Sequence, residues 1–174
     1  MSLAIWIVLA ACAVAVVTDV AYRRIPNALT IALALAALGL HATQGVGSFA
    51  SSVGAMLIVT VLGFGAFSMG WLGGGDVKLA AAGAAAFGLP DALPFLLYTA
   101  LGGGLLAVAV SLFTGRLNAV TRSVALLVRP FAYKGTVAVA PASPVMLPYA
   151  VAIACGAGAV ALSHTAAPFL RLAL

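Results

Sequence analysis

Charged residues are scarce in this chain. Only 6% of its 174 residues are Asp, Glu, Lys or Arg and 65% are hydrophobic, whereas roughly 25% of a soluble domain is charged. Apolar runs of about 20 residues recur along the whole length, and each could cross a hydrocarbon core of roughly 30 Å as a helix. The composition predicts an all-α, polytopic integral membrane protein with one membrane-embedded domain, residues 1–174. It argues against a soluble domain and against a nucleic-acid partner.

Cysteine pairs and metal-binding motifs are lacking too. Cys12 and Cys155 stand alone within apolar runs, so we interpret both as small core residues. The sequence has no His-Glu-x-x-His motif and no serine in a Gly-x-Ser-x-Gly setting, which argues against zinc and serine hydrolases. We therefore expect neither a metal nor a cofactor.

Glycine, proline and charged residues divide the chain into membrane segments. The six predicted helices are 2–20, 28–45, 49–71, 76–90, 92–114 and 145–165. With six crossings, seven of the eight basic residues fall on one side, and Arg171 is the exception. Because Lys and Arg in short loops stay cytoplasmic, that side is predicted to be cytoplasmic and both termini are predicted to lie outside.

Residues 115–144 form the single long polar connection. Its apolar residues approximate one helical face beside Arg122 and Arg129, so we expect a cytoplasmic loop with a short helix lying on the lipid surface. A role in receiving a substrate is the alternative for this loop.

Acidic residues number three: Asp19, Asp76 and Asp91. Asp91 follows Pro90 in a short outer turn, where it is predicted to cap the fifth helix. Asp19 and Asp76 are predicted at the cytoplasmic ends of the first and fourth helices, where ionisable groups are costly and usually functional. The structural alternatives are an ion pair of Asp19 with Arg23 and a helix cap by Asp76.

Two neighbouring carboxylates in a low-dielectric site tend to share one proton. One member can then accept a proton from water while the other donates one to a carbonyl oxygen, as peptide hydrolysis requires. His41 and His164 are predicted at the outer ends of their helices, far from this pair. A small proton-coupled transporter using the same aspartates, and a non-enzymatic assembly scaffold, are the competing hypotheses.

A glycine run, Gly73-Gly74-Gly75, precedes Asp76. Glycine has no β-carbon, so this stretch could leave room for an extended peptide beside the aspartate, or it could be only a flexible turn. Lys78 could favour the ionised form of Asp76 or could extend to lipid phosphates.

These residues resemble motifs of a known family. Gly73-Gly74-Gly75-Asp76 fits the Gly-x-Gly-Asp motif of intramembrane aspartic peptidases, and Val77-Lys78-Leu79 continues it as in type IV prepilin peptidases. Asp19 followed by Arg23-Arg24-Ile25-Pro26-Asn27 resembles that family's first aspartate motif, and Pro148-Tyr149-Ala150 with Gly156 resembles its last helix. The resemblance covers nearly the whole chain, although archaeal preflagellin peptidases are similar too.

The resemblance implies that Asp19 and Asp76 are catalytic and that the partner is a prepilin or pseudopilin precursor. Its short basic leader would be removed at the cytoplasmic face of the bacterial inner membrane. The residues expected to shape the site or position the substrate are Gly73, Gly75, Lys78, Arg23, Pro26 and Asn27.

Larger members carry a cytoplasmic Cys-x-x-Cys domain and methylate the product. This chain lacks that domain, which implies a peptidase without methyltransferase activity, as in enzymes of tight-adherence (Flp-type) pili. The oligomeric state stays open.

Overall fold

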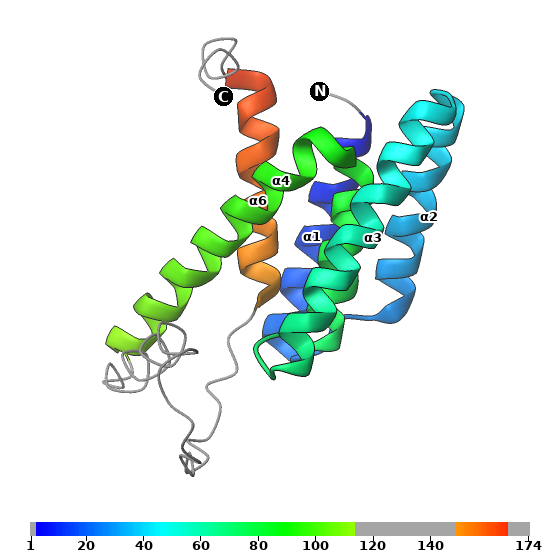
Figure 1. Cartoon of the computed structure of the whole chain (residues 1–174). Coiled ribbons are helices and arrows are strands. Elements are labelled where there is room, and N and C mark those ends of the chain that lie inside the picture. Colours follow the sequence, from blue (N-terminus) through cyan, green and yellow to red (C-terminus); the bar gives the residue numbers. More distant parts are fainter. Residues whose placement is uncertain (1–2, 114–148, 167–174) are drawn as a thin grey trace, which may run out of the picture. The chain divides into compact units, whose positions relative to one another are not determined.

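The computed structural model describes residues 3–113 and 149–166, and these residues are helical apart from short turns. The helices, shown in Figure 1, are α1 (Leu3–Tyr22), α2 (Asn27–Thr43), α3 (Val46–Ser68), α4 (Gly74–Phe113) and α6 (Tyr149–Ala166). The all-α prediction is therefore confirmed for this part of the chain. The predicted loop and surface helix at 115–144 lie outside the described residues.

Three of the described helices are long and apolar enough to cross a membrane. They are Leu3–Tyr22, Val46–Ser68 and the stretch Gly74–Val110 of α4. Two further apolar helices, Asn27–Thr43 and Tyr149–His164, are shorter. These lengths support a membrane protein, while the count of six crossings stays a prediction.

Residues 1–103 and 148–174 form one compact unit, and residues 104–147 form another. In the first unit, α1 packs against α2 and α6, and α2 packs against α3. The first part of α4 is the most enclosed element, because every residue from 81 to 88 is buried. Alanine dominates this stretch, which lets neighbouring helices approach closely.

Helix α4 is broken near its middle. Gly88 has φ 74° and ψ 175°, outside the helical region, and Pro90 and Pro94 follow it. A positive φ of this kind is accessible to glycine at little cost. The break at Gly88 comes two residues before the predicted end of helix 76–90, and the chain reverses its direction there (Figure 1).

The break removes backbone partners that lipid cannot replace. Side chains of α2 and α3 compensate for this loss. Ser52 Oγ donates to Ala85 O (2.6 Å), His41 Nε2 donates to Ala86 O (3.1 Å), and Ser51 Oγ accepts from Leu89 N–H (2.9 Å). The turn is therefore fixed by its neighbours as well as by its own sequence.

After the break, α4 packs against α6 through glycines. A Cβ on Gly156 would lie 2.9 Å from both Phe95 O and Thr99 N, so the backbones of the two helices are nearly in contact. Further toward the start of α6, a Cβ on Gly102 would lie 3.4 Å from Cys155 Cβ. Such small-residue contacts are typical of helix pairs in membranes.

The prediction that both cysteines are core residues is half right. Cys12 on α1 is buried, but Cys155 is exposed. The reason is the orientation of α6, which turns Ala152, Gly156 and Ala157 inward and leaves Cys155 at the rim of the contact with α4.

Replacing Gly156 tests this close packing. Gly156→Ala should lower the unfolding free energy by about 1–3 kcal/mol, because the new methyl group meets backbone atoms that cannot rotate away. Gly158→Ala is the matched control: a Cβ there meets nothing within 4 Å, and alanine is the better helix former. Thermal unfolding of the purified protein in detergent should show a lower midpoint for the first variant alone. Equal midpoints would contradict the packing described.

Candidate functional site

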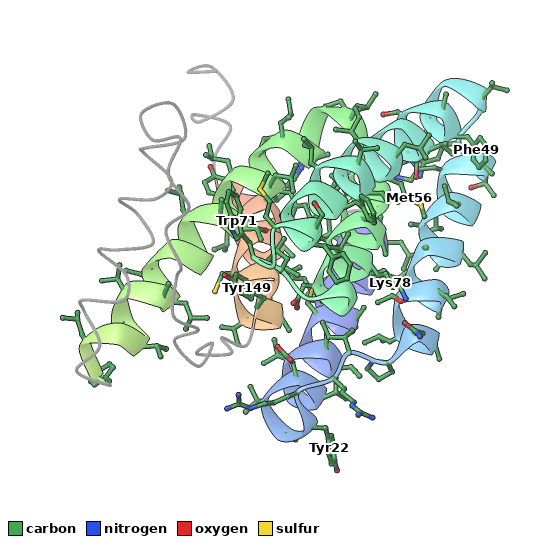
Figure 2. All side chains as sticks on the ribbon, turned by 60° about the horizontal axis from the view of Figure 1, so that its bottom comes forward. Tyr22, Phe49, Met56, Trp71, Lys78 and Tyr149 are labelled. Atoms are coloured by element: carbon green, nitrogen blue, oxygen red, sulfur yellow. The ribbon has the colours of Figure 1, made fainter. Side chains whose placement is uncertain are left out.

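The two predicted catalytic aspartates lie at the same end of the first unit. This end, the lower end in Figure 1, comprises the C-terminal ends of α1 and α3 and the starts of α2, α4 and α6. Asp19 is in the last turn of α1 and Asp76 in the first turn of α4. Figure 2 turns this end toward the viewer, with Lys78, Tyr149 and Tyr22 labelled around it.

Asp19 is half-buried and bonded to the start of α6. Its Oδ2 accepts the N–H of Ala150 at 3.3 Å, across 131 sequence positions. A helix N-terminus presents free N–H groups and a positive dipole end, and both favour a carboxylate. The Asp19 carboxylate is therefore stabilised by the backbone N–H and the dipole at the start of α6.

The ion pair of Asp19 with Arg23, the structural alternative for Asp19, does not form in the described structure, where the single ion pair joins two other residues. Arg23 instead adopts φ 53° and its N–H donates to Asp19 O at 2.8 Å. This left-handed residue ends α1.

Asp76 is half-buried too and is the third residue of α4. Its Oδ2 accepts the N–H of Gly73 at 3.1 Å, which is the back-bond an acid makes in a capping box. Asp76 thus caps α4 from the third position of the helix. The helix cap that was the structural alternative is therefore observed, and it is compatible with a chemical role. A Cβ on Gly73 would lie 2.8 Å from the same oxygen, so this position has no room for a side chain.

The two carboxylates are electrostatically coupled. Asp19 lies close enough to Asp76 for their charges to interact, and Tyr149 interacts with Asp76 in the same way. Tyr149 directly precedes Ala150, the donor to Asp19. Two acids from α1 and α4 therefore lie within electrostatic range of each other near the first turn of α6.

The turn between α1 and α2 packs onto the first turn of α4. Lys78 Nζ donates to Asn27 Oδ1 at 3.0 Å, and a Cβ on Gly75 would lie 3.2 Å from Ile25 Cβ. Pro26 lies between these contacts and precedes the first residue of α2. We call residues 25–27 with Gly75 and Lys78 the turn clamp. The described partner of Lys78 is thus neither Asp76 nor a phosphate but Asn27, which the sequence did not indicate.

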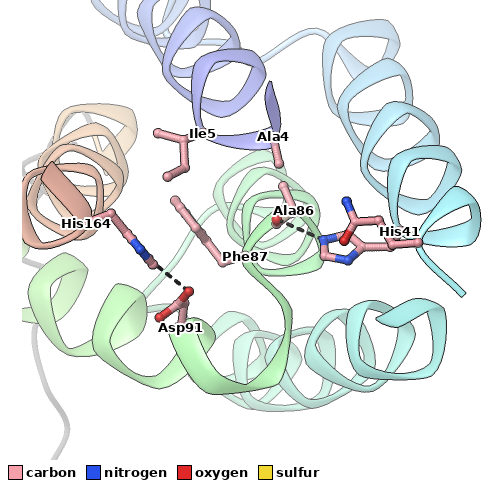
Figure 3. A pocket seen from close by; sticks show the side chains of 8 residues that line it. Ala4, Ile5, His41, Ala86, Phe87, Asp91 and His164 are labelled. Atoms are coloured by element: carbon pink, nitrogen blue, oxygen red, sulfur yellow. Dashed lines mark hydrogen bonds and ion pairs between the residues drawn. The ribbon is translucent and has the colours of Figure 1, made fainter. Parts of the chain in front are cut away.

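Asp91 lies at the opposite, upper end with both histidines. The expected helix cap by Asp91 is not among its described contacts; instead Oδ2 meets His164 Nε2 at 2.9 Å, because the last turn of α6 ends beside it. His41 bonds Ser48 Oγ at 2.6 Å as well as Ala86 O. Figure 3 shows these side chains around a cavity of about 100 Å³. Both histidines lie at the end opposite the aspartate pair, as predicted, and both are hydrogen-bonded.

Tyr149 and Ala150 were not identified as site residues from physical arguments. A signal was available, because they lie within the first two turns of the last predicted helix, 145–165, at the end predicted on the same side of the membrane as Asp19 and Asp76. Within the described ranges no group of three or more His, Cys, Asp or Glu side chains is arranged to hold a metal ion.

Comparisons with known proteins identify the family. No curated protein and no solved structure gave a significant match. Residues 6–108, which carry both aspartates and the turn clamp, match the type IV leader peptidase family. This match covers more than half of the chain, and a peptidase role follows from it. The chain belongs to the type IV leader peptidase family.

Proposed function

We propose that this protein is an aspartic endopeptidase that removes the short basic leader of prepilin-like precursors. The observation that carries the proposal is the meeting of Asp19 and Asp76, two half-buried carboxylates from different helices whose charges interact. Membership of the type IV leader peptidase family supports the substrate class. The cleavage reaction takes place at the lower end of the described bundle.

In this mechanism the two carboxylates share one proton, because like charges at close range resist full ionisation. The ionised partner accepts a proton from the attacking water. The protonated partner donates to the oxygen of the scissile carbonyl, and the roles reverse when the intermediate collapses. The N–H groups of Ala150 and Gly73 orient one oxygen of each carboxylate and leave the other oxygen for water or substrate.

The remaining predicted site residues have structural roles in this proposal. Because Gly73 has no side chain, Asp76 Oδ2 has room to accept the Gly73 N–H. Gly75, Pro26, Asn27 and Lys78 form the turn clamp, which ties the chain just after Asp19 to the helix that carries Asp76. Arg23 ends α1 in a left-handed turn that leads into the clamp. These residues act by fixing the geometry of the pair.

The proposed setting is the bacterial inner membrane, with six crossings, both termini outside, and the aspartates near the cytoplasmic face. The exposed basic residues Arg23, Arg24 and Lys78 at the lower end agree with that orientation. Residues 115–144 would then be a cytoplasmic loop of the single domain. Methyltransferase activity is not expected, because the α1–α2 connection is only a short turn.

A proton-coupled transporter is less well supported. Such a protein needs polar groups along a path through the bundle. Among the described residues Thr30 and Ser52 are buried polar residues, and each donates to a backbone carbonyl. Thr99 adds one buried hydroxyl, and these three groups do not form a charged path. No specific observation favours transport or a purely structural scaffold.

Neutralising either aspartate should abolish processing. With Asp19→Asn or Asp76→Asn, cleavage of a co-expressed prepilin should fall at least about hundredfold, the usual effect of losing a general acid or base. Accumulation of leader-bearing precursor on a gel, confirmed by mass spectrometry, measures the effect.

Thr18→Val is the matched control for these variants. Thr18 precedes Asp19, but its hydroxyl bonds only within its own helix, to Ala15 O at 3.0 Å, so processing should continue. Normal processing by both asparagine variants would exclude the peptidase mechanism and favour a scaffold.

The turn clamp can be separated from direct electrostatic action of Lys78 on Asp76. Asn27→Leu should lower kcat by about tenfold, because the clamp bond is lost and small displacements of catalytic groups are costly. Asn27→Asp should retain most activity, since a carboxylate still accepts from Lys78. If Lys78 acted only on Asp76, Asn27→Leu would be as active as the wild type.

Gly73→Ala tests the space beside Asp76. The added methyl group would lie within 2.8 Å of Oδ2 and should displace the carboxylate, lowering kcat by about tenfold or more. Gly65→Ala is the control, because a Cβ there meets nothing within 4 Å. Equal kcat for the two variants in a cleavage assay would contradict the geometry proposed for Asp76.

A further inference from the structure

A polar contact joins the far ends of α4 and α6. Asp91 Oδ2 and His164 Nε2 are 2.9 Å apart, with 37% and 23% of their side chains exposed. In Figure 3 the His164 ring points from α6 directly at Asp91, just beyond the break in α4. The other titratable group around this cavity is His41, and α1 contributes only Ala4 and Ile5. This pair is the single ion pair among the described residues.

The interface between these helices is lined by glycines. Gly102, Gly103 and Gly156 face the partner helix, where Cβ atoms, a tyrosine ring edge, the Thr99 hydroxyl and backbone atoms lie against them. Interdigitated side chains are what normally fix the axial position of one helix on another. Small side chains seated on glycines give close approach but only shallow interlocking, and α6 packs on α1 as well. A directional polar contact at the far end therefore adds to what holds the axial position of α6.

The axial position of α6 determines the surroundings of Asp19. Ala150, in the first turn of α6, donates to Asp19 Oδ2 at 3.3 Å, already near the limit of a hydrogen bond. A shift of α6 by a single residue rise, about 1.5 Å, would break that bond. Roughly 20 Å of helix separates Ala150 from His164, and a helix transmits axial displacement along its length.

We propose that Asp91 and His164 are positioning residues: their contact fixes α6 axially against α4 so that the Ala150 N–H meets Asp19. Neither residue touches the substrate in this arrangement. The catalytic part of the inference rests on the proposed peptidase function, and its structural part does not.

Kinetics provide the first test. Asp91→Ala and His164→Leu should each lower kcat on a prepilin substrate by about tenfold and leave KM within about twofold, because the substrate contacts are unchanged. His164→Gln retains a donor N–H and should keep most of the wild-type kcat. The exchanged pair Asp91→His with His164→Asp should recover most of the loss.

The matched control is Ser163→Ala. Ser163 neighbours His164 on α6, but its hydroxyl donates within the helix, to Val160 O at 2.7 Å, so kcat should not change. Wild-type kcat in Asp91→Ala and His164→Leu, or an exchanged pair no better than the single variants, would overturn the inference.

A disulfide test needs no catalysis. In Gly102→Cys the new Cβ would lie 3.4 Å from that of the native Cys155, close to the separation in a disulfide. A membrane-permeant oxidant should cross-link the two thiols quickly in this variant. Adding His164→Leu should slow the reaction by about fivefold or more, because disulfide geometry is narrow, whereas adding Ser163→Ala should not.

Unchanged cross-linking rates in His164→Leu would overturn the axial role even if the protein is a peptidase. Slower cross-linking in a protein that cleaves no prepilin would support the axial role and reject the proposed function. The two ideas can therefore fail separately.

Discussion

Backbone hydrogen bonding in an apolar surrounding is the constraint on which the rest of this structure depends. Helix α4 has 40 residues, and a straight helix of that length would be about 60 Å long, roughly twice the thickness of a hydrocarbon core. The chain turns back at Gly88 instead, and the freed carbonyls and N–H group are satisfied by His41, Ser51 and Ser52. This reversal is what lets residues 89–103 of α4 pack against α6 within the first unit.

Backbone groups also provide the hydrogen bonds to the two aspartates. Their described hydrogen-bond partners are N–H groups of the backbone at two helix starts. Of the cationic side chains nearby, Lys78 bonds an amide, and Arg23 forms no ion pair with either acid in the described part of the chain. A bound cation would favour the ionised form of a carboxylate, whereas a pair that exchanges protons must be able to take either form. Hydrogen bonds from backbone N–H groups leave both carboxylates able to take either form.

The sequence predicted the features that depend on local pattern. Apolar runs indicated the helices, Gly88 with Pro90 indicated the break, and the scarcity of acids drew attention to Asp19 and Asp76. It did not predict contacts such as Lys78 with Asn27 or His164 with Asp91, because the partners are 51 and 73 positions apart. Many polar groups could have served as partners, and only the packing of α4 against its neighbours selects among them. The exposure of Cys155 depends on the rotation of α6, which its uniformly apolar sequence leaves undetermined.

The donor to Asp19 belongs to the last helix described, 131 positions further along the chain. During synthesis, α1 through the first part of α4 emerge first, and they already contain both acids and the whole turn clamp. Asp19 acquires its backbone donor only when α6 joins them. Membrane insertion of α6 is therefore also the step that completes the aspartate environment, so a ribosome-bound chain that has not yet reached Tyr149 carries both acids without that environment.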